Sequence, residues 1–273
     1  MSAGTLPVMA VDFAGWTAEH YLSYRRDVPD EVISQLIEQF GLGSTDRVLD
    51  LGVGTGQLLL PLLRRLGLGI GLDREPDMLR LLRDRARAER AELVAVLAAA
   101  EDLAVVGTVL GEGSMSLVTV ANALHWMDAA EVFRQAHRLL RPGGGIAVVS
   151  HGLPLWLTDT SWARALNRYL QEWLGPATGS MCGLDDATRG ERISLLHAAG
   201  FQDVTVLRHD YEAVVTPQYV IGHLYSAMSE TDVPAASRTT FEQGVVDTLR
   251  EHQPATGLVE HVPVIALAAH ARR

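Results

Sequence analysis

The chain has 273 residues, a formal net charge of −10 and a hydrophobic fraction of 48%. That fraction supplies a sizeable core and argues against global disorder, and the length suits one enlarged domain or a domain with a small cap. The acidic balance argues against a nucleic-acid surface, which would need a basic stripe, and it favours a cationic ligand over a polyanionic one.

A single cysteine, Cys182, excludes an intramolecular disulfide and a zinc cluster built from thiolates. We therefore expect no metal site. Residues 1–10 lack the pattern of a signal peptide. The apolar runs are shorter than the roughly 20 residues that cross a membrane. These absences predict a cytoplasmic protein without a membrane-spanning segment.

The first half of the chain alternates strands with helices. A helix is predicted over residues 30–40, whose apolar side chains share one face and which Gly41 can end. Five short apolar runs follow as predicted strands, with helical patterns between them, at residues 47–51, 67–73, 93–98, 116–122 and 146–150. This alternation predicts a mainly parallel sheet with helices on both faces.

The pattern changes after Ser150. Residues 151–188 carry three tryptophans among glycines and prolines, without a strand pattern. The later segments are read as a helix at 189–199, a strand at 204–211, further helix within 217–252 and a closing strand at 262–269. The two irregular stretches are too short for cores of their own, so they are predicted to be insertions above the sheet.

Three glycines follow the first predicted strand directly, in the run VLDLGVGTGQ. Gly52, Gly54 and Gly56 allow the backbone to turn sharply and to approach a ligand closely, at the sheet edge where open α/β folds bind ligands. A dinucleotide-binding fold would have a further glycine where Gln57 stands. Asp50 adds a carboxylate just before the glycines.

Asp73 ends the second predicted strand. The two oxygens of a carboxylate match the two hydroxyls of a ribose, and an acid at this place in the fold binds the ribose of an adenosyl ligand. Alternatively, Asp73 caps the helix that Pro76 opens, and the two roles can coexist.

More polar residues follow the third and fourth predicted strands. Glu101 or Asp102 could accept a hydrogen bond from an adenine amino group, or both could simply be solvated. Asn122, His125 and Trp126 come after the fourth strand. Since parallel strands end at one edge of the sheet, these residues are expected near the reacting centre.

The runs VLDLGVGTG, AEDL, ANALHWMD and LLRPGG, together with Asp73, occur in an order and spacing that resembles the class I S-adenosylmethionine-dependent methyltransferases. More narrowly, they look like the small-molecule group related to trans-aconitate methyltransferase. The strong match covers about residues 46–150, and a weaker one reaches the run YLSYR near the start. The resemblance implies a Rossmann-like, seven-stranded, mostly parallel sheet with helices on both faces, a helical lid and S-adenosyl-L-methionine as cofactor.

A single methyltransferase domain is expected on this resemblance. Its predicted parts are N-terminal cap helices at 1–45, a cofactor-binding core at 46–150, lid and acceptor insertions at 151–190 and 213–258, and a closing strand at 259–273.

The resemblance also assigns parts of the cofactor to residues. Asp50 and the glycine loop would hold the methionine part and Asp73 the ribose. The adenine would fall to Glu101 or Asp102 with the backbone of Ala100. The full expected set is Tyr24, Arg25, Asp50, Gly52, Gly54, Gly56, Gln57, Asp73, Ala100, Glu101, Asp102 and Asn122.

Two positions depart from the family pattern. Ala99 stands where an acid is common, which shifts adenine recognition towards Glu101. Ser116 replaces the aspartate that opens the fourth strand, a change expected to affect strand geometry more than chemistry.

A sulfonium methyl group is already activated, so the protein must mainly align the reacting atoms, about 3 to 3.5 Å apart. A general base is needed only when the nucleophile arrives protonated. His125 is the leading candidate base, because its ordinary pKa suits neutral pH; alternatively, it only packs and positions its loop. His151 is the second candidate, and His20 could enter from the N-terminal cap.

Aromatic residues are the candidates for the acceptor pocket. For each tryptophan, ordinary core packing is the alternative, although three tryptophans within residues 151–190 favour a lid over the site. The residues expected to contact the acceptor are His20, Trp126, Trp156 and Tyr225.

Other function classes fit less well. A nicotinamide dehydrogenase is disfavoured by Gln57 and by the place of Asp50. Nucleic-acid methylation is disfavoured by the charge and by the run Asn122-Ala123-Leu124-His125, which has no stacking aromatic in fourth place. A fold that binds the cofactor without methylating, as a binding module or for another reaction, would keep every motif.

We expect a small-molecule acceptor, and O- or N-methylation of a natural product such as an antibiotic is one form of this. We expect no nucleic-acid or membrane partner. A homodimer is left open.

Overall fold

The computed structural model describes residues 13–175, 183–254 and 257–271. Residues 1–10 and Cys182, which entered the sequence argument, lie outside this range. The chain divides into two compact units. We call them the sheet unit, formed by Arg26–Leu153, Met181–Tyr211 and His261–Arg273, and the helical unit, formed by Met1–Arg25, Pro154–Ser180 and Glu212–Glu260.

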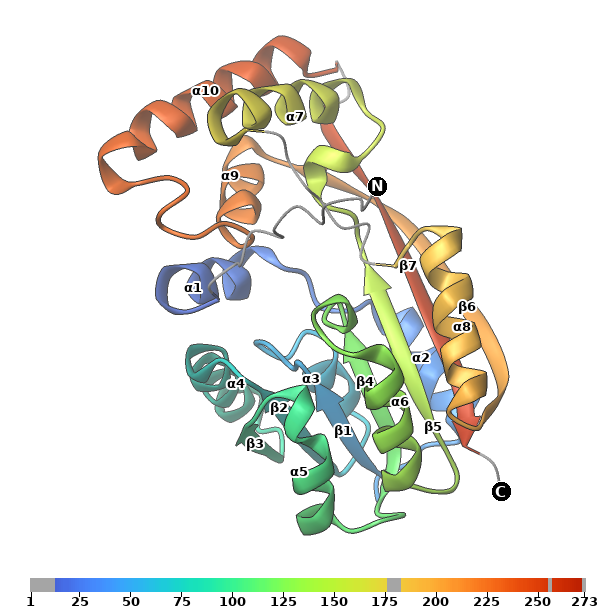
Figure 1. Ribbon diagram of the computed structural model, residues 1–273. Coiled ribbons are helices and arrows are strands. Elements are labelled where there is room, and N and C mark those ends of the chain that lie inside the picture. Colours follow the sequence, from blue (N-terminus) through green and yellow to red (C-terminus); the bar gives the residue numbers. More distant parts are fainter. Residues whose placement is uncertain (1–12, 176–182, 255–256, 272–273) are drawn as a thin grey trace, which may run out of the picture. The chain divides into compact units, whose positions relative to one another are not determined.

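Strands and helices alternate along the chain as the sequence predicted (Figure 1). The strands are β1 (Arg47–Leu51), β2 (Leu68–Asp73), β3 (Leu93–Leu97), β4 (Met115–Ala121), β5 (Leu140–His151), β6 (Phe201–Val215) and β7 (Leu258–Ala271). The helices are α1 (Gly15–Tyr24), α2 (Asp30–Phe40), α3 (Leu59–Leu63), α4 (Pro76–Glu89), α5 (Leu103–Leu110), α6 (Ala129–Leu139), α7 (Ser161–Leu174), α8 (Asp186–Ala198), α9 (Pro217–Tyr225) and α10 (Arg238–His252). Short 3₁₀ turns lie at Ala100–Asp102, Leu124–Trp126, Leu155–Leu157 and Ala235–Ser237.

The seven strands form one sheet in the order β3-β2-β1-β4-β5-β7-β6. β1 pairs in parallel with β2 and β4, β2 with β3, and β4 with β5, whereas β7 runs antiparallel to β5. The predicted seven-stranded, mostly parallel sheet is therefore confirmed. Because β1 and β4 are neighbours although β2 and β3 lie between them in sequence, the strand order reverses beside β1, where open α/β sheets bind ligands.

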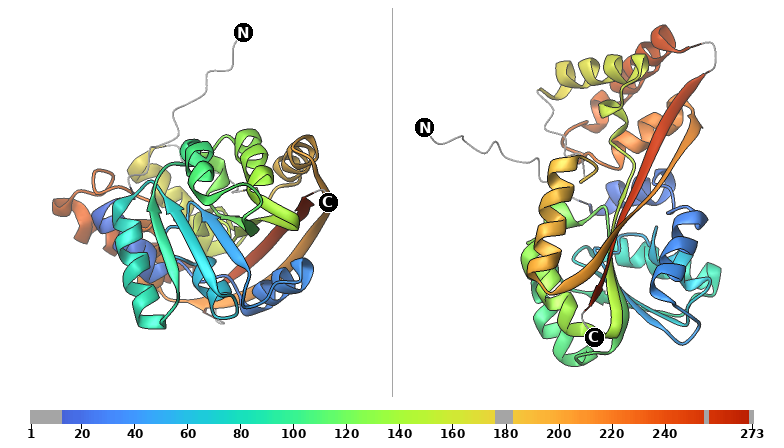
Figure 2. Two further views of the ribbon diagram at one scale, coloured as in Figure 1. Left: turned by 90° about the horizontal axis from the view of Figure 1, so that it is seen from below. Right: turned by 90° about the vertical axis from the view of Figure 1, so that its right-hand side faces the viewer.

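Helices cover both faces of the sheet unit (Figure 2). On one face α5, α6 and α8 pack on the strands through a core that includes Leu103, Phe133 and Leu196. On the other face the strands approach α2, α3 and α4 so closely that glycines are required. A Cβ on Gly71 would lie 3.0 Å from Val53 and 3.2 Å from Leu82 of α4.

One run with the composition of a turn is part of a strand. Arg141-Pro142-Gly143-Gly144 lies within β5, which begins at Leu140 and not at residue 146, where the predicted strand starts. The pairing jumps from Met115 with Leu140 to Leu117 with Gly145, so the extra residues form a bulge in the strand. Gly143 has a φ of +76°, which glycine adopts without strain.

The helical unit has a core of its own. Trp162 and Leu166 of α7, Leu224 of α9 and Phe241 of α10 belong to one buried cluster. Three chain segments, each too short to bury a core alone, thus share one. Among the described residues, no helix combines the length and the apolar character needed to cross a membrane.

Candidate functional site

The glycine loop between β1 and α3 has the backbone form that its sequence predicts. Gly52, Gly54 and Gly56 have φ values of +64°, +54° and +91°, in the region that L side chains rarely adopt. A Cβ on Gly52 would lie 2.6 Å from the Cβ of Ala123, just after β4. The loop is therefore packed tightly against the end of the neighbouring strand.

Asp73 is fixed to this loop. Its Oδ2 accepts a hydrogen bond from the Gly54 amide at 2.8 Å, and its Oδ1 accepts one from the Glu75 amide at 2.9 Å. Burial raises the pKa of Asp73, although the amides of Glu75 and Gly54 act in the opposite direction. The Arg74 amide is a third backbone donor to this carboxylate, so part of its four acceptor sites remains for a ribose hydroxyl. The cap of α4 is the side chain of Glu75, which accepts from the Asp77 amide.

Asp50 is fully buried inside β1. The hydroxyl of Thr119 donates to its Oδ1 at 2.7 Å, and the two residues are direct partners in the pairing of β1 with β4. Burial raises the pKa of Asp50 to about 7, with the Thr119 hydrogen bond lowering it and the charge of Asp73 raising it further. Contact of this carboxyl with the methionine part of a cofactor stays a prediction.

The two acids after β3 are both exposed to solvent but differ in their hydrogen bonds. Asp102 Oδ2 accepts the Ala99 amide at 3.0 Å and so closes the 3₁₀ turn in which Ala100 lies. Because the carboxylate of Asp102 already bonds to its own turn, Glu101 is the better candidate for an adenine amino group.

The ends of β4 and β5 are joined by Asn122. Its amide nitrogen donates to the carbonyl of His151 at 3.0 Å, and its amide oxygen accepts from the His151 amide at 2.8 Å. Asn122 holds a φ of +49° to do so. The side chain of His151 in turn lies 2.9 Å, Nε2 to hydroxyl, from Tyr211 of β6. Asn122 therefore positions His151, and a cofactor contact of Asn122 stays a prediction.

His125 lies in the 3₁₀ turn after β4, beside Trp126, with ring centroids 4.8 Å apart. Burial lowers the pKa of His125 to about 4, and the charge of Arg192 acts in the same direction. Its Nδ1 is buried and has no hydrogen-bond partner among the described residues. The imidazole is thus neutral at physiological pH. Trp126 has 45% of its surface exposed.

The N-terminal candidates lie in the helical unit. Arg25 Nε donates to the hydroxyl of Ser226 at 2.8 Å, and the ring of Tyr24 packs on the backbone of Gly222 in α9. His20 Nδ1 bonds to the Trp16 carbonyl at 2.8 Å. These side chains are well fixed within their unit, and their predicted contacts with cofactor or acceptor stay predictions.

The aromatic candidates of the helical unit differ in burial. Tyr225 is buried and donates its hydroxyl to Glu242 at 2.9 Å, and burial together with Glu242 raises its pKa. Trp162 is buried and donates its indole N–H to the Val259 carbonyl at 3.2 Å, which is the core-packing role. Trp156 is half-buried at the edge of the same cluster.

Sequence reasoning missed the partners that hold the candidates in place. Thr119 of β4 and Tyr211 of β6 are fixed by strand register, and Arg85 of α4 contacts the glycine loop. The signal for Thr119 was a polar residue in the middle of a mainly apolar strand. Among the residues described, no group of three or more His, Cys, Asp or Glu side chains could hold a metal ion.

Similarity to known proteins identifies the family of this chain. A family profile described as a methyltransferase domain matches residues 48–144. An uncharacterized methyltransferase of Mycobacterium bovis is 32% identical over 234 residues, covering 84% of this chain and 82% of the relative. The chain belongs to the class I S-adenosylmethionine-dependent methyltransferases. S-Adenosylmethionine is the cofactor of this methyltransferase, and the positive φ angles of the glycine loop and the Asp73 carboxylate beside it suit an adenosyl group.

Further relatives of the methyltransferase are more distant. A malonyl-[acyl-carrier protein] O-methyltransferase of Marinomonas is 33% identical over 46% of each chain. Among solved structures, the YcgJ protein of Bacillus subtilis has a TM-score of 0.57 at 17% identity, covering 90% of this chain and 100% of that one. A Bacillus halodurans methyltransferase has a TM-score of 0.54 at 15% identity, with 89% and 100% covered. These structures share the fold.

Proposed function

We propose that the methyltransferase transfers the methyl group of S-adenosylmethionine to a small-molecule acceptor by in-line displacement. The observation that carries the proposal is the fixed pair of Asp73 and the glycine loop, because the Gly54 amide donates to Asp73 at 2.8 Å. That bond joins the predicted ribose acceptor to the loop predicted to hold the methionine part.

The work of the residues is mainly alignment. The cofactor supplies a methyl group already activated by its sulfonium, so acceptor atom, methyl carbon and sulfur need to be close to collinear. A rigid loop with three positive φ values and an aspartate held by two amides suit this task, since neither has to reorganise when the cofactor binds.

We assign the base role, where the acceptor arrives protonated, to His151 ahead of His125. A pKa of about 4 makes His125 a weak base at neutral pH. Both backbone polar groups of His151 are held by Asn122, and its Nε2 is 2.9 Å from the Tyr211 hydroxyl. His151 therefore has a fixed orientation and a partner that can exchange a proton with it.

Aromatic side chains of the helical unit support an apolar small molecule as the acceptor. Trp16, Tyr225 and His20 form a group with ring centroids 4.4 to 5.3 Å apart, and Trp156 packs against the hydrophobic cluster to which Tyr225 belongs. Aromatic side chains of this kind line pockets for apolar small molecules. The relative from Marinomonas, named as an O-methyltransferase, supports O-methylation within this proposal, and a natural-product acceptor suits it.

Binding of S-adenosylhomocysteine, measured by calorimetry, tests the cofactor part. Replacing Asp73→Ala should weaken binding by at least about 1.5 kcal/mol, because a charged hydrogen bond of at least this worth is lost. Asp84→Ala is the matched control, since Asp84 pairs with Arg87 on the exposed face of α4. Unchanged affinity in Asp73→Ala would remove Asp73 from the site.

Turnover of histidine variants tests the base. Transfer of a labelled methyl group to the acceptor should fall about 10²- to 10⁴-fold in His151→Gln, as expected for loss of a general base. His125→Gln should reduce turnover far less. The reverse pattern would return the base role to His125, and equal loss of turnover and cofactor affinity would mean that His151 only positions its strand.

A further inference from the structure

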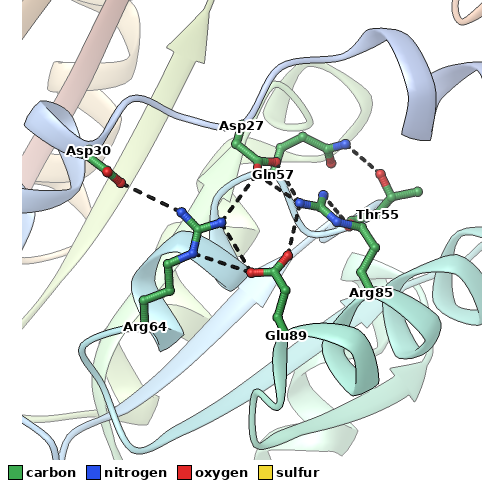
Figure 3. A network of polar contacts seen from close by, with 7 residues as sticks. All are labelled: Asp27, Asp30, Thr55, Gln57, Arg64, Arg85 and Glu89. Atoms are coloured by element: carbon green, nitrogen blue, oxygen red, sulfur yellow. Dashed lines mark hydrogen bonds and ion pairs between the residues drawn. The ribbon is translucent and has the colours of Figure 1, made fainter.

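A network of charged side chains lies behind the glycine loop and has no part in the family assignment (Figure 3). Arg85 of α4 donates from Nη1 to the carbonyl of Thr55, in the middle of the loop, at 3.0 Å. Its Nη2 donates to both carboxylate oxygens of Asp27, at 3.0 and 2.8 Å. One guanidinium thus holds the loop backbone and the segment before α2 together.

The same two segments are joined by their backbones. The Val28 amide donates to the Gln57 carbonyl at 2.8 Å, and the Gln57 side chain donates to the Thr55 hydroxyl at 2.5 Å. Thr55 itself is fully buried. Arg85 and Val28 therefore hold the loop at Thr55 and Gln57. Asp73, at the end of β2, holds it at Gly54.

Arg85 is more enclosed than its neighbour Arg64. The side chain of Arg85 is 18% exposed and that of Arg64 is 51% exposed. Both arginines bind Glu89, Arg64 at 3.2 Å and Arg85 at 3.4 Å. Within the described part of the chain Arg64 pairs with Asp27, Asp30 and Glu89, whereas Arg85 also reaches the loop. Exposed ion pairs contribute little, so the bond of Arg85 to the Thr55 carbonyl is the distinctive one.

We infer that Arg85 is a positioning residue for cofactor binding. A loop with three glycines loses more backbone entropy on becoming rigid than an ordinary loop. By fixing the Thr55 carbonyl and Asp27 at once, Arg85 holds the loop in its binding form before the cofactor arrives, so less ordering remains to oppose binding. The inference rests on the proposed role of this loop as the cofactor cradle.

The fork of the guanidinium is what makes one side chain sufficient. Arginine presents several N–H donors in a fixed plane and can serve a carbonyl and a carboxylate together, whereas a lysine ammonium is a point charge on a flexible stem. Arg85→Lys should therefore recover only part of what Arg85→Met loses, although the charge is kept.

Calorimetric titration with S-adenosylhomocysteine tests the inference on the full chain. We expect Arg85→Met to raise the dissociation constant about tenfold, the effect of losing one charge-assisted hydrogen bond, with Arg85→Lys in between. The KM for S-adenosylmethionine should rise with it while kcat changes less than about twofold. Arg64→Met is the matched control, because it removes an arginine from the same network without touching the loop, and its affinity should equal that of the wild type.

Asp27 allows a second test of the inference. Asp27→Asn should also weaken binding of S-adenosylhomocysteine. In the Arg85→Met background it should cause no further loss of affinity, because the two side chains act as one unit. Wild-type affinity in both Arg85→Met and Arg85→Lys overturns the inference. Equal losses in Arg64→Met and Arg85→Met overturn it too, since a general loss of stability would then explain both. If the wild type itself fails to bind S-adenosylhomocysteine, the proposed function fails instead.

Discussion

Asp50 shows how one buried residue can set the pH dependence of stability. Its carboxyl is fully enclosed, and burial raises its pKa to about 7, whereas an unfolded chain has an aspartate pKa of about 3.9. Between these values the folded protein holds a proton that the unfolded chain has released. The stability that depends on this proton is complete below about pH 4 and is lost as the pH rises through 7.

Replacing Asp50→Asn should remove this dependence. One pKa unit corresponds to about 1.4 kcal/mol, so the wild type should lose on the order of 4 kcal/mol of unfolding free energy between pH 4 and pH 8 that the variant keeps. The amide can still bond to the Thr119 hydroxyl, so packing is preserved. Urea unfolding of both proteins across this range measures the effect, and parallel pH profiles would contradict it.

At the scale of single residues, the sequence identified the candidate site residues better than the residues that hold them in place. The glycines and Asp73 were predictable, because a run of glycines and an acid at a strand end have meaning without tertiary structure. Thr119 and Arg85 were not, since their roles depend on the register of β1 with β4 and on the packing of α4 behind the loop.

Helices and strands were predicted where the apolar residues recur with a single clear spacing. The helix over residues 30–40 is α2, with Gly41 at a φ of +58° ending it. By contrast, α7 was read as irregular sequence, because tryptophans, glycines and prolines around it obscured a helical pattern. Thr160 caps α7 by accepting the Ala163 amide, and Trp162, Leu166 and Leu170 recur at four-residue spacing on its buried face.

Strand ends were predicted less well than strand centres. β5 extends back to Leu140 and β6 covers Phe201–Val215, a longer span than the apolar runs that predicted them. The reason is physical: a bulge, as in Arg141-Pro142-Gly143-Gly144, resembles a turn in composition, and an exposed edge strand such as β6 needs no apolar run.

At the scale of the whole molecule, candidate residues divide between the units. The glycine loop, Asp73, Glu101, His125 and His151 lie in the sheet unit, whereas the candidates His20, Tyr24, Arg25, Trp156 and Tyr225 lie in the helical unit. Each unit has its own buried cluster. Regions with separate cores can open separately in solution.

The separate cores predict that the helical unit can be weakened alone. Phe241 is fully buried in its cluster, and Phe241→Ala should cost about 3 to 5 kcal/mol through the lost contacts and the cavity. Four of the five tryptophans, Trp16, Trp156, Trp162 and Trp173, lie in this unit, so tryptophan fluorescence should report its unfolding at lower urea.

The sheet unit should still bind S-adenosylhomocysteine in Phe241→Ala at a urea concentration where the fluorescence transition is complete. Phe133→Ala is the matched control, because Phe133 is equally buried in the sheet unit and its loss should weaken that unit first. If binding and fluorescence are lost together in both variants, the two cores unfold as one cooperative unit. In that case, the division of the chain describes its packing and not its energetics.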